Sequence, residues 1–330
     1  MISILAQGAF ALAVANSHMT TWVLPSHALI RVLDRPTFCI SSVSARPGLQ
    51  HDADPRYISA NSLVMISQVT PPQESREPVS TALGVKLTKT TSPIKTSYAG
   101  QVIQGLDVWV EDGNAIQINH DNVIVRNVRV HHKTGDGINV TNAKGVRIER
   151  VEVINMDPPN GFDGESDTSI INIEGFKAPN LTITNSTVRN GASGIYIQQS
   201  PGVVIDHVDG YNFHGGFPRG QFVQFGFSDG SRLTNFYTKS DLYNSRTEDN
   251  VNVYHSNNVT IENGVIDGNN SPSGVGVLFE GDSSGGVVRN VDVVRQSNGG
   301  FSSYSNNVDF FDVRVFDGYN TDIGRGKSMS

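Results

Sequence analysis

Three acidic residues at alternate positions precede a short apolar strand in the stretch NGFDGESDTSIINIEG, which covers residues 160–175. They are Asp163, Glu165 and Asp167. Together with Ser169 and Glu174 they fall at positions 1, 3, 5, 7 and 12 of an EF-hand-like loop, where oxygen atoms bind Ca²⁺. Position 6 is Thr168 instead of Gly, and a strand replaces the following helix. The three acids therefore form a candidate partial Ca²⁺ site, a substrate contact or a solvated loop, and no other cofactor is indicated.

Further reactive residues lie in two polar stretches, GYNFHGGFPRGQ and SDLYNSRTEDN. Mixed charge of this kind suits a β-elimination lyase, which neutralises the carboxylate of a uronic acid, abstracts the adjacent proton and protonates the leaving oxygen. The candidates for the neutralising charge are Arg219 and Arg246. The candidates for the base are His214, Lys239 and Arg246, and those for the acid are Tyr196 and Tyr243.

The elements that must position these residues are indicated by a local repeat, in which Asn, Gly or another small residue precedes an alternating aliphatic run. The aliphatic position is occupied by Val123, Val146, Leu181, Val203, Leu233, Val259, Val287 and Val308, with spacings of 23, 35, 22, 30, 26, 28 and 21 residues. Asn and Gly adopt left-handed backbone most easily, which suits tight turns. Three short strands in about 22 residues leave no room for a crossover helix. The repeat therefore predicts an all-β parallel β-helix (solenoid) of about eight to nine coils, whereas a β-sandwich would use hairpins.

Residues 1–95 do not share this repeat. They are predicted to be an irregular N-terminal segment, either a cap over the first coil or a poorly ordered region, and residues 96–330 the solenoid. The sequence stops within a coil, without a capping helix. This suggests an oligomeric contact, a further C-terminal domain or a truncated chain.

Composition excludes several classes of function. The net charge is −7 and no basic stripe is present, so a nucleic-acid partner is not expected. No apolar run reaches the roughly 18 to 20 residues of a membrane helix, so no membrane span is expected. The N-terminal apolar run ends in Ala13-Val14-Ala15 but lacks the positive residues of a signal peptide. An extracellular or bacterial cell-surface location is expected, although the signal itself is not convincing.

The run TGDGINVTNAKGVRIERVEVIN resembles the coils of the pectate-lyase-like superfamily of right-handed β-helix proteins, over about residues 100–330. This superfamily includes polysaccharide lyases, polygalacturonase-type hydrolases, epimerases and tailspikes, so the resemblance implies a right-handed, single-stranded solenoid and a secreted, carbohydrate-active protein. TGDGINVTN is similar to a polygalacturonase motif and would place Asp136 on a catalytic aspartate. The same alignment puts Thr168-Ser169 where paired aspartates belong and Ser193 where a histidine belongs, so that signature is incomplete.

Aligning the aliphatic-polar-aliphatic strands predicts a column of outward side chains, because alternate residues of a strand face opposite ways. The column is Gln117, Asn139, Asn172, Tyr196, Gln224, Asn252 and Gly276. Such a polar ribbon, open to solvent, suits the binding of a sugar chain, although any exposed strand face is polar. Asp136 and Tyr243 are added as candidate substrate contacts.

Insertions precede Asn172, Gln224 and Asn252 in this alignment, so three loops are expected along one edge of the same face and should form the wall of a groove. The loops carry the candidate catalytic residues Asp167, His214, Arg219, Lys239, Arg246, Glu248 and Asp249. His131 and His132 lie in a shorter turn and are interpreted as solvated, since no second ligand cluster accompanies them.

Three functions remain open. The leading hypothesis is lyase-type cleavage of an acidic, uronate-containing polysaccharide or oligosaccharide. The first alternative is a glycoside hydrolase, which needs two carboxyl groups about 5 to 9.5 Å apart. Asp167 paired with Asp249 or Glu248 would span about 14 Å at about 4.8 Å per coil, so Asp136 is the nearer partner of Asp167. The second alternative is a non-catalytic polysaccharide-binding, adhesin or tailspike-like module.

Overall fold

Stacked coils of short strands make up the described part of the chain after residue 84. The computed structural model describes residues 85–158, 170–215, 220–242, 245, 247–271 and 274–316, and strand residues 21–23 and 29–31. The chain divides into two compact units, residues 1–52 and 53–330. In the first unit, β1 (Thr21–Val23) pairs antiparallel with β2 (Leu29–Arg31).

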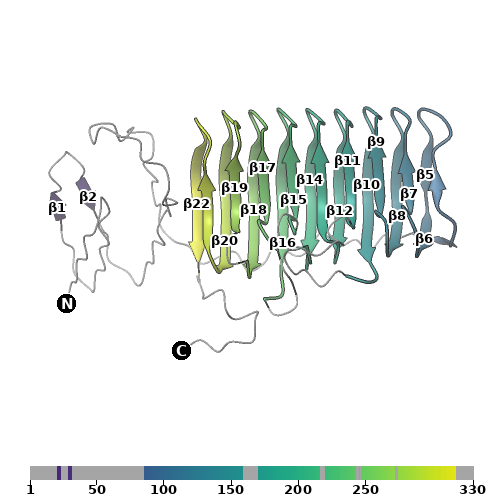
Figure 1. Ribbon diagram of the computed structural model, residues 1–330, viewed down its shortest axis with the longest axis horizontal. Coiled ribbons are helices and arrows are strands. Elements are labelled where there is room, and N and C mark those ends of the chain that lie inside the picture. The colour runs from purple at the N-terminus through teal and green to yellow at the C-terminus, as the bar shows by residue number, and fades with distance from the viewer. Residues whose placement is uncertain are drawn as a thin grey trace. The chain divides into compact units, whose positions relative to one another are not determined.

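Two parallel sheets run along the solenoid (Figure 1). Sheet I has eleven strands: β3 (Thr88–Thr90), β5 (Val102–Gln104), β6 (Leu106–Val110), β8 (Ile124–His132), β10 (Arg147–Asn155), β12 (Thr182–Arg189), β14 (Val204–Tyr211), β16 (Arg232–Lys239), β18 (Thr260–Asn269), β20 (Val287–Gln296) and β22 (Asp309–Phe316). Sheet II has nine strands: β4 (Ile94–Lys95), β7 (Ile116–Ile118), β9 (Ile138–Thr141), β11 (Ile171–Phe176), β13 (Ser193–Gln198), β15 (Val223–Gly226), β17 (Val251–Tyr254), β19 (Val275–Glu280) and β21 (Gly299–Ser303). The described residues contain no helix, and the predicted parallel β-helix of eight to nine coils is confirmed.

Left-handed residues make the turns between strands. Positive φ angles occur at the Asn or Gly of the sequence repeat, for example at Asn122, Asn180 and Asn258. A second set lies inside the sheet I strands, where Asn263 and Asn290 of neighbouring coils also share a side-chain hydrogen bond of 3.0 Å. Asn enters this backbone region more easily than most residues, so the repeated Asn has the conformational role that the sequence predicted.

Strand register corrects two copies of the repeat. Leu233 pairs with Ile205, so the residue next to Val203 is Ser231, whose hydroxyl accepts a hydrogen bond from the Val203 N–H at 3.2 Å. Val287 likewise pairs with Thr260 instead of Val259. A buried, hydrogen-bonded hydroxyl replaces the aliphatic residue at Ser231, and Gly286 takes the place next to Val259, so the aliphatic signature alone misplaced these two copies.

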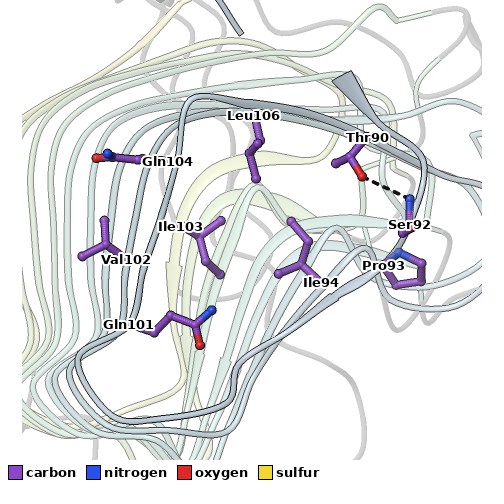
Figure 2. A pocket seen from close by; sticks show the side chains of 9 residues that line it. All are labelled: Thr90, Ser92, Pro93, Ile94, Gln101, Val102, Ile103, Gln104 and Leu106. Carbon is purple, nitrogen blue, oxygen red and sulfur yellow. Dashed lines mark hydrogen bonds between the residues drawn. The ribbon is translucent and has the colours of Figure 1, made fainter. Parts of the chain in front are cut away.

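The N-terminal end of the solenoid is an apolar hollow, shown in Figure 2. Ile94, Ile103 and Leu106 come from β4, β5 and β6 and line it together with polar but uncharged side chains. Because β3 and β4 already pair with the coils that follow, the solenoid begins before residue 96, the predicted boundary. No ionisable side chain lines this hollow, so acid–base chemistry must be sought elsewhere.

The core is a continuous column of Val and Ile with a few large aromatic rings. Phe213, Phe222 and Phe236 are fully buried, and successive ring centroids lie 5.9 and 6.1 Å apart. The coil after Phe236 provides the room for its ring, since Gly264 stands directly opposite Phe236 in the register. A Cβ atom at Gly264 would lie 2.1 Å from the Cζ atom of Phe236. The two positions therefore share one fixed volume.

Replacing Gly264 by Ala tests this shared volume. Gly264→Ala should lower the free energy of unfolding by about 1 to 3 kcal/mol, because the added methyl group overpacks the core. Urea denaturation measures the change. Phe236→Leu frees space, so the double variant should be more stable than the sum of the two single effects predicts. Strictly additive effects would show that the two side chains do not compete for space.

Candidate active site on sheet II

The outward column of sheet II is now fixed by strand register. Gln117, Asn139, Tyr196, Gln224 and Asn252 occupy it as predicted. The prediction was wrong in two coils, because the column position is held by Glu174 instead of Asn172 and by Leu278 instead of Gly276. Each error is a shift of two residues, which keeps the alternation of the strand and is therefore invisible in its pattern.

The Asn172 side chain points into the corner between the two sheets and is fully buried, so it cannot contact a sugar on the outward face. Its amide nitrogen donates to the backbone oxygens of Val153 and Arg189, at 3.4 and 3.0 Å, and to Nε2 of His132 at 3.1 Å. His132 Nδ1 then carries the proton and donates to the Gly135 carbonyl oxygen at 2.7 Å. The buried side chain of Asn172 closes the corner and is a structural group.

The interpretation of the two histidines as solvated was also wrong. His132 is fully buried, and burial lowers the pKa of its imidazole to about 4. His131 stacks on the Trp109 ring with 3.7 Å between ring centroids, and its Nε2 lies 3.3 Å from Asp107. Both rings therefore hold coils together.

The column is less open to solvent than predicted. Asn139, Gln224 and Asn252 are only 8%, 9% and 3% exposed, while Tyr196 is half-buried. Carboxyl groups of neighbouring coils cover the two asparagines. The face is thus a row of hydrogen-bonded clusters with one ring between them.

The first cluster joins Asp136, Asn139 and Glu174. Asp136 accepts from the backbone N–H of Ile171 in the next coil at 3.1 Å and from the Asn139 amide at 2.9 Å. The Asn139 amide also donates to Glu174. Burial raises the pKa of Asp136, and the hydrogen bonds from Asn139 and Ile171 oppose that rise.

The second cluster repeats the arrangement four coils later. Asp249 accepts from the backbone N–H of Val275 at 2.8 Å and from the Asn252 amide at 3.1 Å. The Asn252 amide nitrogen also lies 2.9 Å from Glu280 Oε1. The Asn252 amide thus contacts the carboxyl groups of both Asp249 and Glu280. The nearest oxygens of these two groups are at most about 6 Å apart, the sum of the two hydrogen-bond lengths.

Glu248 adds a third carboxyl group to the second cluster. Burial, followed by the neighbouring Asp249 charge, raises the pKa of Glu248 to about 8, and the Glu280 charge contributes to the rise. Burial also raises the pKa of Asp249 to about 6. The Gln221 amide donates to Glu248 Oε2 at 3.2 Å. The cluster therefore retains a proton on Glu248 near neutral pH while a second carboxyl group is ionised.

The three predicted loops all occur at the same kind of connection in the chain. Each joins the end of a sheet I strand to the start of a sheet II strand, between β10 and β11, β14 and β15, and β16 and β17. The candidates Asp163, Glu165, Asp167, Arg219, Tyr243 and Arg246 lie outside the described residues. Among the described residues, no three His, Cys, Asp or Glu side chains are arranged to hold a metal ion.

Two other predicted catalytic residues are separate from the second cluster. Lys239 is exposed at the end of β16 in sheet I, where it pairs with Tyr211 and Asp267. His214 lies in the second loop, and burial lowers its pKa, an effect that the charge of Asp241 partly offsets. Of the predicted catalytic set, the described structure brings together Glu248 and Asp249.

Glu174, Gln221 and Glu280 are site residues that the sequence analysis did not select. Asp-x-x-Asn occurs at both 136–139 and 249–252, but it also occurs at 157–160, 209–212, 241–244, 267–270 and 317–320, so the pattern alone does not identify the two clusters. The glutamates lie on the following coil, one at the column position and one two residues beyond it. Only a correct register connects each glutamate with its asparagine.

Comparisons with known proteins agree with the fold. The family model described as "Right handed beta helix region" matches residues 114–226, which confirms the predicted right-handed β-helix there. No curated protein matches the sequence. In the part of the chain that the structure describes, no helix has the length and apolar character needed to cross a membrane.

Several solved structures share this fold at low identity. The periplasmic alginate epimerase AlgG is 14% identical with a TM-score of 0.49, over 64% of this chain and 50% of that one, so this chain spans half of its length. The surface protein and adhesin PfbA of Streptococcus pneumoniae is 12% identical with a TM-score of 0.34, over 70% and 83%. An endo-xylogalacturonan hydrolase of Aspergillus tubingensis is 11% identical with a TM-score of 0.35, over 69% and 84%.

The raised pKa of Glu248 makes stability depend on pH. The folded protein keeps a proton that the unfolded chain releases above about pH 4.5, so stability should fall as pH rises towards about 8. Buried His132 acts in the opposite direction only below about pH 6.5. Between about pH 6.5 and about pH 8, Glu248→Gln should remove most of the fall in the free energy of unfolding. The expected difference is roughly 1 to 2 kcal/mol after allowance for the partial exposure of Glu248.

Urea denaturation at several pH values in that window measures the slope. Glu262→Gln is the matched control, because Glu262 pairs with Arg289 on sheet I, away from the cluster, and should leave the slope unchanged. Equal slopes for the wild type and Glu248→Gln would contradict the assignment of the proton to Glu248.

Proposed function

We propose that this protein hydrolyses a glycosidic bond of a polysaccharide bound along sheet II, with Glu248 as the general acid. The observation that carries the proposal is the second cluster, in which one carboxyl group stays protonated beside others that ionise. Two carboxyl groups with separated pKa values are the requirement of glycoside hydrolysis. Glu248 and Asp249 belong to the third loop, and they lie beside the outward column through Asn252.

The members of the second cluster would have different roles in the reaction. Glu248 would protonate the glycosidic oxygen, and Glu280 would act on the sugar or on a water molecule. Asp249 is almost completely buried and holds Asn252, which in turn orients Glu280, so Asp249 is a positioning residue. The charges of Asp249 and Glu280 raise the pKa of Glu248, as a general acid at neutral pH needs.

The rest of the column would bind the sugar chain. Tyr196 pairs with Glu174 on one side and Gln224 on the other, midway between the two clusters. Its ring offers an apolar face for a sugar, and the neighbouring amide and carboxyl groups offer hydrogen-bond partners. A polymer of this kind is consistent with the expected extracellular or cell-surface location.

Lyase chemistry remains the second candidate because burial keeps His214 neutral, as a base must be. The positive groups that it requires, Arg219 and Arg246, lie outside the described residues, and Lys239 is on sheet I. The pKa difference between Glu248 and Asp249 in the second cluster supports hydrolysis as the first candidate. A binding module without catalysis is the third outcome of the test.

The test is incubation of the protein with a panel of neutral and uronate-containing polysaccharides. Hydrolysis should release new reducing ends without the ultraviolet absorbance of unsaturated uronates. Glu248→Gln should lower the rate by about 10² to 10⁴, the usual contribution of a general acid, whereas Glu262→Gln should leave it unchanged. Reducing ends accompanied by that absorbance would replace hydrolysis with β-elimination, and retained binding without new ends would indicate a binding module.

A further inference from the structure

An exposed aromatic cluster lies at the ends of two neighbouring sheet II strands. It consists of Phe227, Tyr254 and His255, which follow or end β15 and β17. The Phe227 and His255 rings are stacked, with centroids 4.9 Å apart and planes 17° apart. The Tyr254 ring stands on edge to both, with centroids 5.7 Å from Phe227 and 4.2 Å from His255. The three rings are in mutual contact on the surface of the solenoid.

The cluster leaves a large apolar area in water. Phe227 is 46% exposed and Tyr254 is 36% exposed. Burial in the core therefore does not account for the choice of aromatic residues here. Contiguous exposed apolar area of this kind commonly marks a binding surface.

The backbone at Phe227 strengthens this conclusion. Phe227 has a φ angle of 50°, in the left-handed region that disfavours bulky residues. The corresponding turn residues of other coils are Asn142, Lys177, Gln199, His255 and Gly281, all with positive φ. The turn therefore tolerates small or polar residues, and the fold does not require a phenylalanine. A bulky residue kept in a strained conformation at the surface points to a function of the ring.

The surroundings of the cluster connect it with the column of the proposed active site. Gly226 and Tyr254 are paired, and they lie two residues beyond Gln224 and Asn252 on the same outward face, about 7 Å along the strands. Gly226 has no side chain, and its Cβ position is 2.3 Å from Gln198 Oε1. That oxygen is buried and has no hydrogen-bond partner among the described residues. The rings therefore lie beside a position that has no side chain, on the same outward face as Gln224 and Asn252.

We propose that Phe227, Tyr254 and His255 form a sugar-binding subsite that stacks on one pyranose ring of a polysaccharide. The faces of aromatic rings are negative, and they attract the slightly positive C–H groups on the flat side of a pyranose. The subsite rests on the proposed function in one respect, because the same polymer would continue over Asn252 to the carboxyl cluster.

The occupant is a sugar chain because the exposed rings continue the outward face of Gln224 and Asn252, on which the proposed polysaccharide substrate would lie. A stack that only ties two coils together would predict a loss of stability when Phe227 is replaced. A contact with a second copy of the chain would predict a concentration-dependent dimer that the same replacement disrupts. Each alternative changes a different measurement.

Phe227→Asn is the decisive variant. Asn occupies the corresponding turn at Asn142, so this change should maintain or raise the melting temperature while it removes the ring. The full chain with Glu248→Gln, which prevents turnover, serves as the parent in affinity electrophoresis with polygalacturonate, alginate, xylan and a soluble β-glucan. Adding Phe227→Asn should weaken binding about 3- to 10-fold for the polymers that the parent binds, and Tyr254→Ala should also weaken it.

Tyr98→Ala is the matched control, because Tyr98 is 61% exposed in the first coils, away from the cluster, and should leave binding unchanged. The proposal is overturned if the parent binds none of the four polymers, or if Phe227→Asn binds as the parent does. It is also overturned if Phe227→Asn only lowers the melting temperature or only dissociates a dimer. Weakened binding without new reducing ends in the wild type would retain the subsite and reject hydrolysis.

Discussion

Main-chain hydrogen bonding between neighbouring coils is the constraint on which the rest of the structure depends. Each strand of sheets I and II must stand in parallel register with the strand before it and the strand after it, at a spacing of about 4.8 Å. A coil can therefore gain residues only at its turns. The three long insertions all lie between a sheet I strand and the following sheet II strand, and so they border one face. The proposed active site lies on that face because the ladders exclude extra residues elsewhere.

The same constraint explains what could be predicted from the sequence. The turn residues have a local conformational role, so Asn122, Asn180 and Asn258 revealed the coils without any knowledge of their partners. Strand register depends on the partner coil, and a slip of two residues preserves the alternation of strands such as Ile171-Asn172-Ile173. The insertion before this strand changes the length of the coil, so the spacing of the repeat no longer indicates which residue of the strand occupies the column. Asn172 was consequently placed on the surface and Glu174 was missed, although both lie in the same strand.

Burial was the second quantity that the sequence could not give. His132, Asp136 and Asp249 are ionisable residues next to turns, where a solvated side chain is the usual expectation. In the folded chain they are almost fully covered, because each one supplies a hydrogen bond that the coil corner needs. Their pKa values move through burial, and the direction follows from the charge of each group. Thus residues that serve the architecture also set the electrostatics of the proposed site.

The two Asp-x-x-Asn clusters show how one structural device can acquire chemistry. In both, the aspartate accepts the N–H that begins the next sheet II strand and the asparagine connects it with a glutamate. This bridge is sufficient to join two coils, so it needs no catalytic role. The residue before Asp136 is Gly135, whereas the residue before Asp249 is Glu248. The Glu248 carboxyl group is largely buried and lies beside the charges of Asp249 and Glu280, so it retains its proton. About 19 Å of polar face, four coil spacings, separates the clusters. A substrate chain on that face would meet a structural bridge at one end and a proton donor at the other, so the asymmetry between Gly135 and Glu248 determines where cleavage is expected.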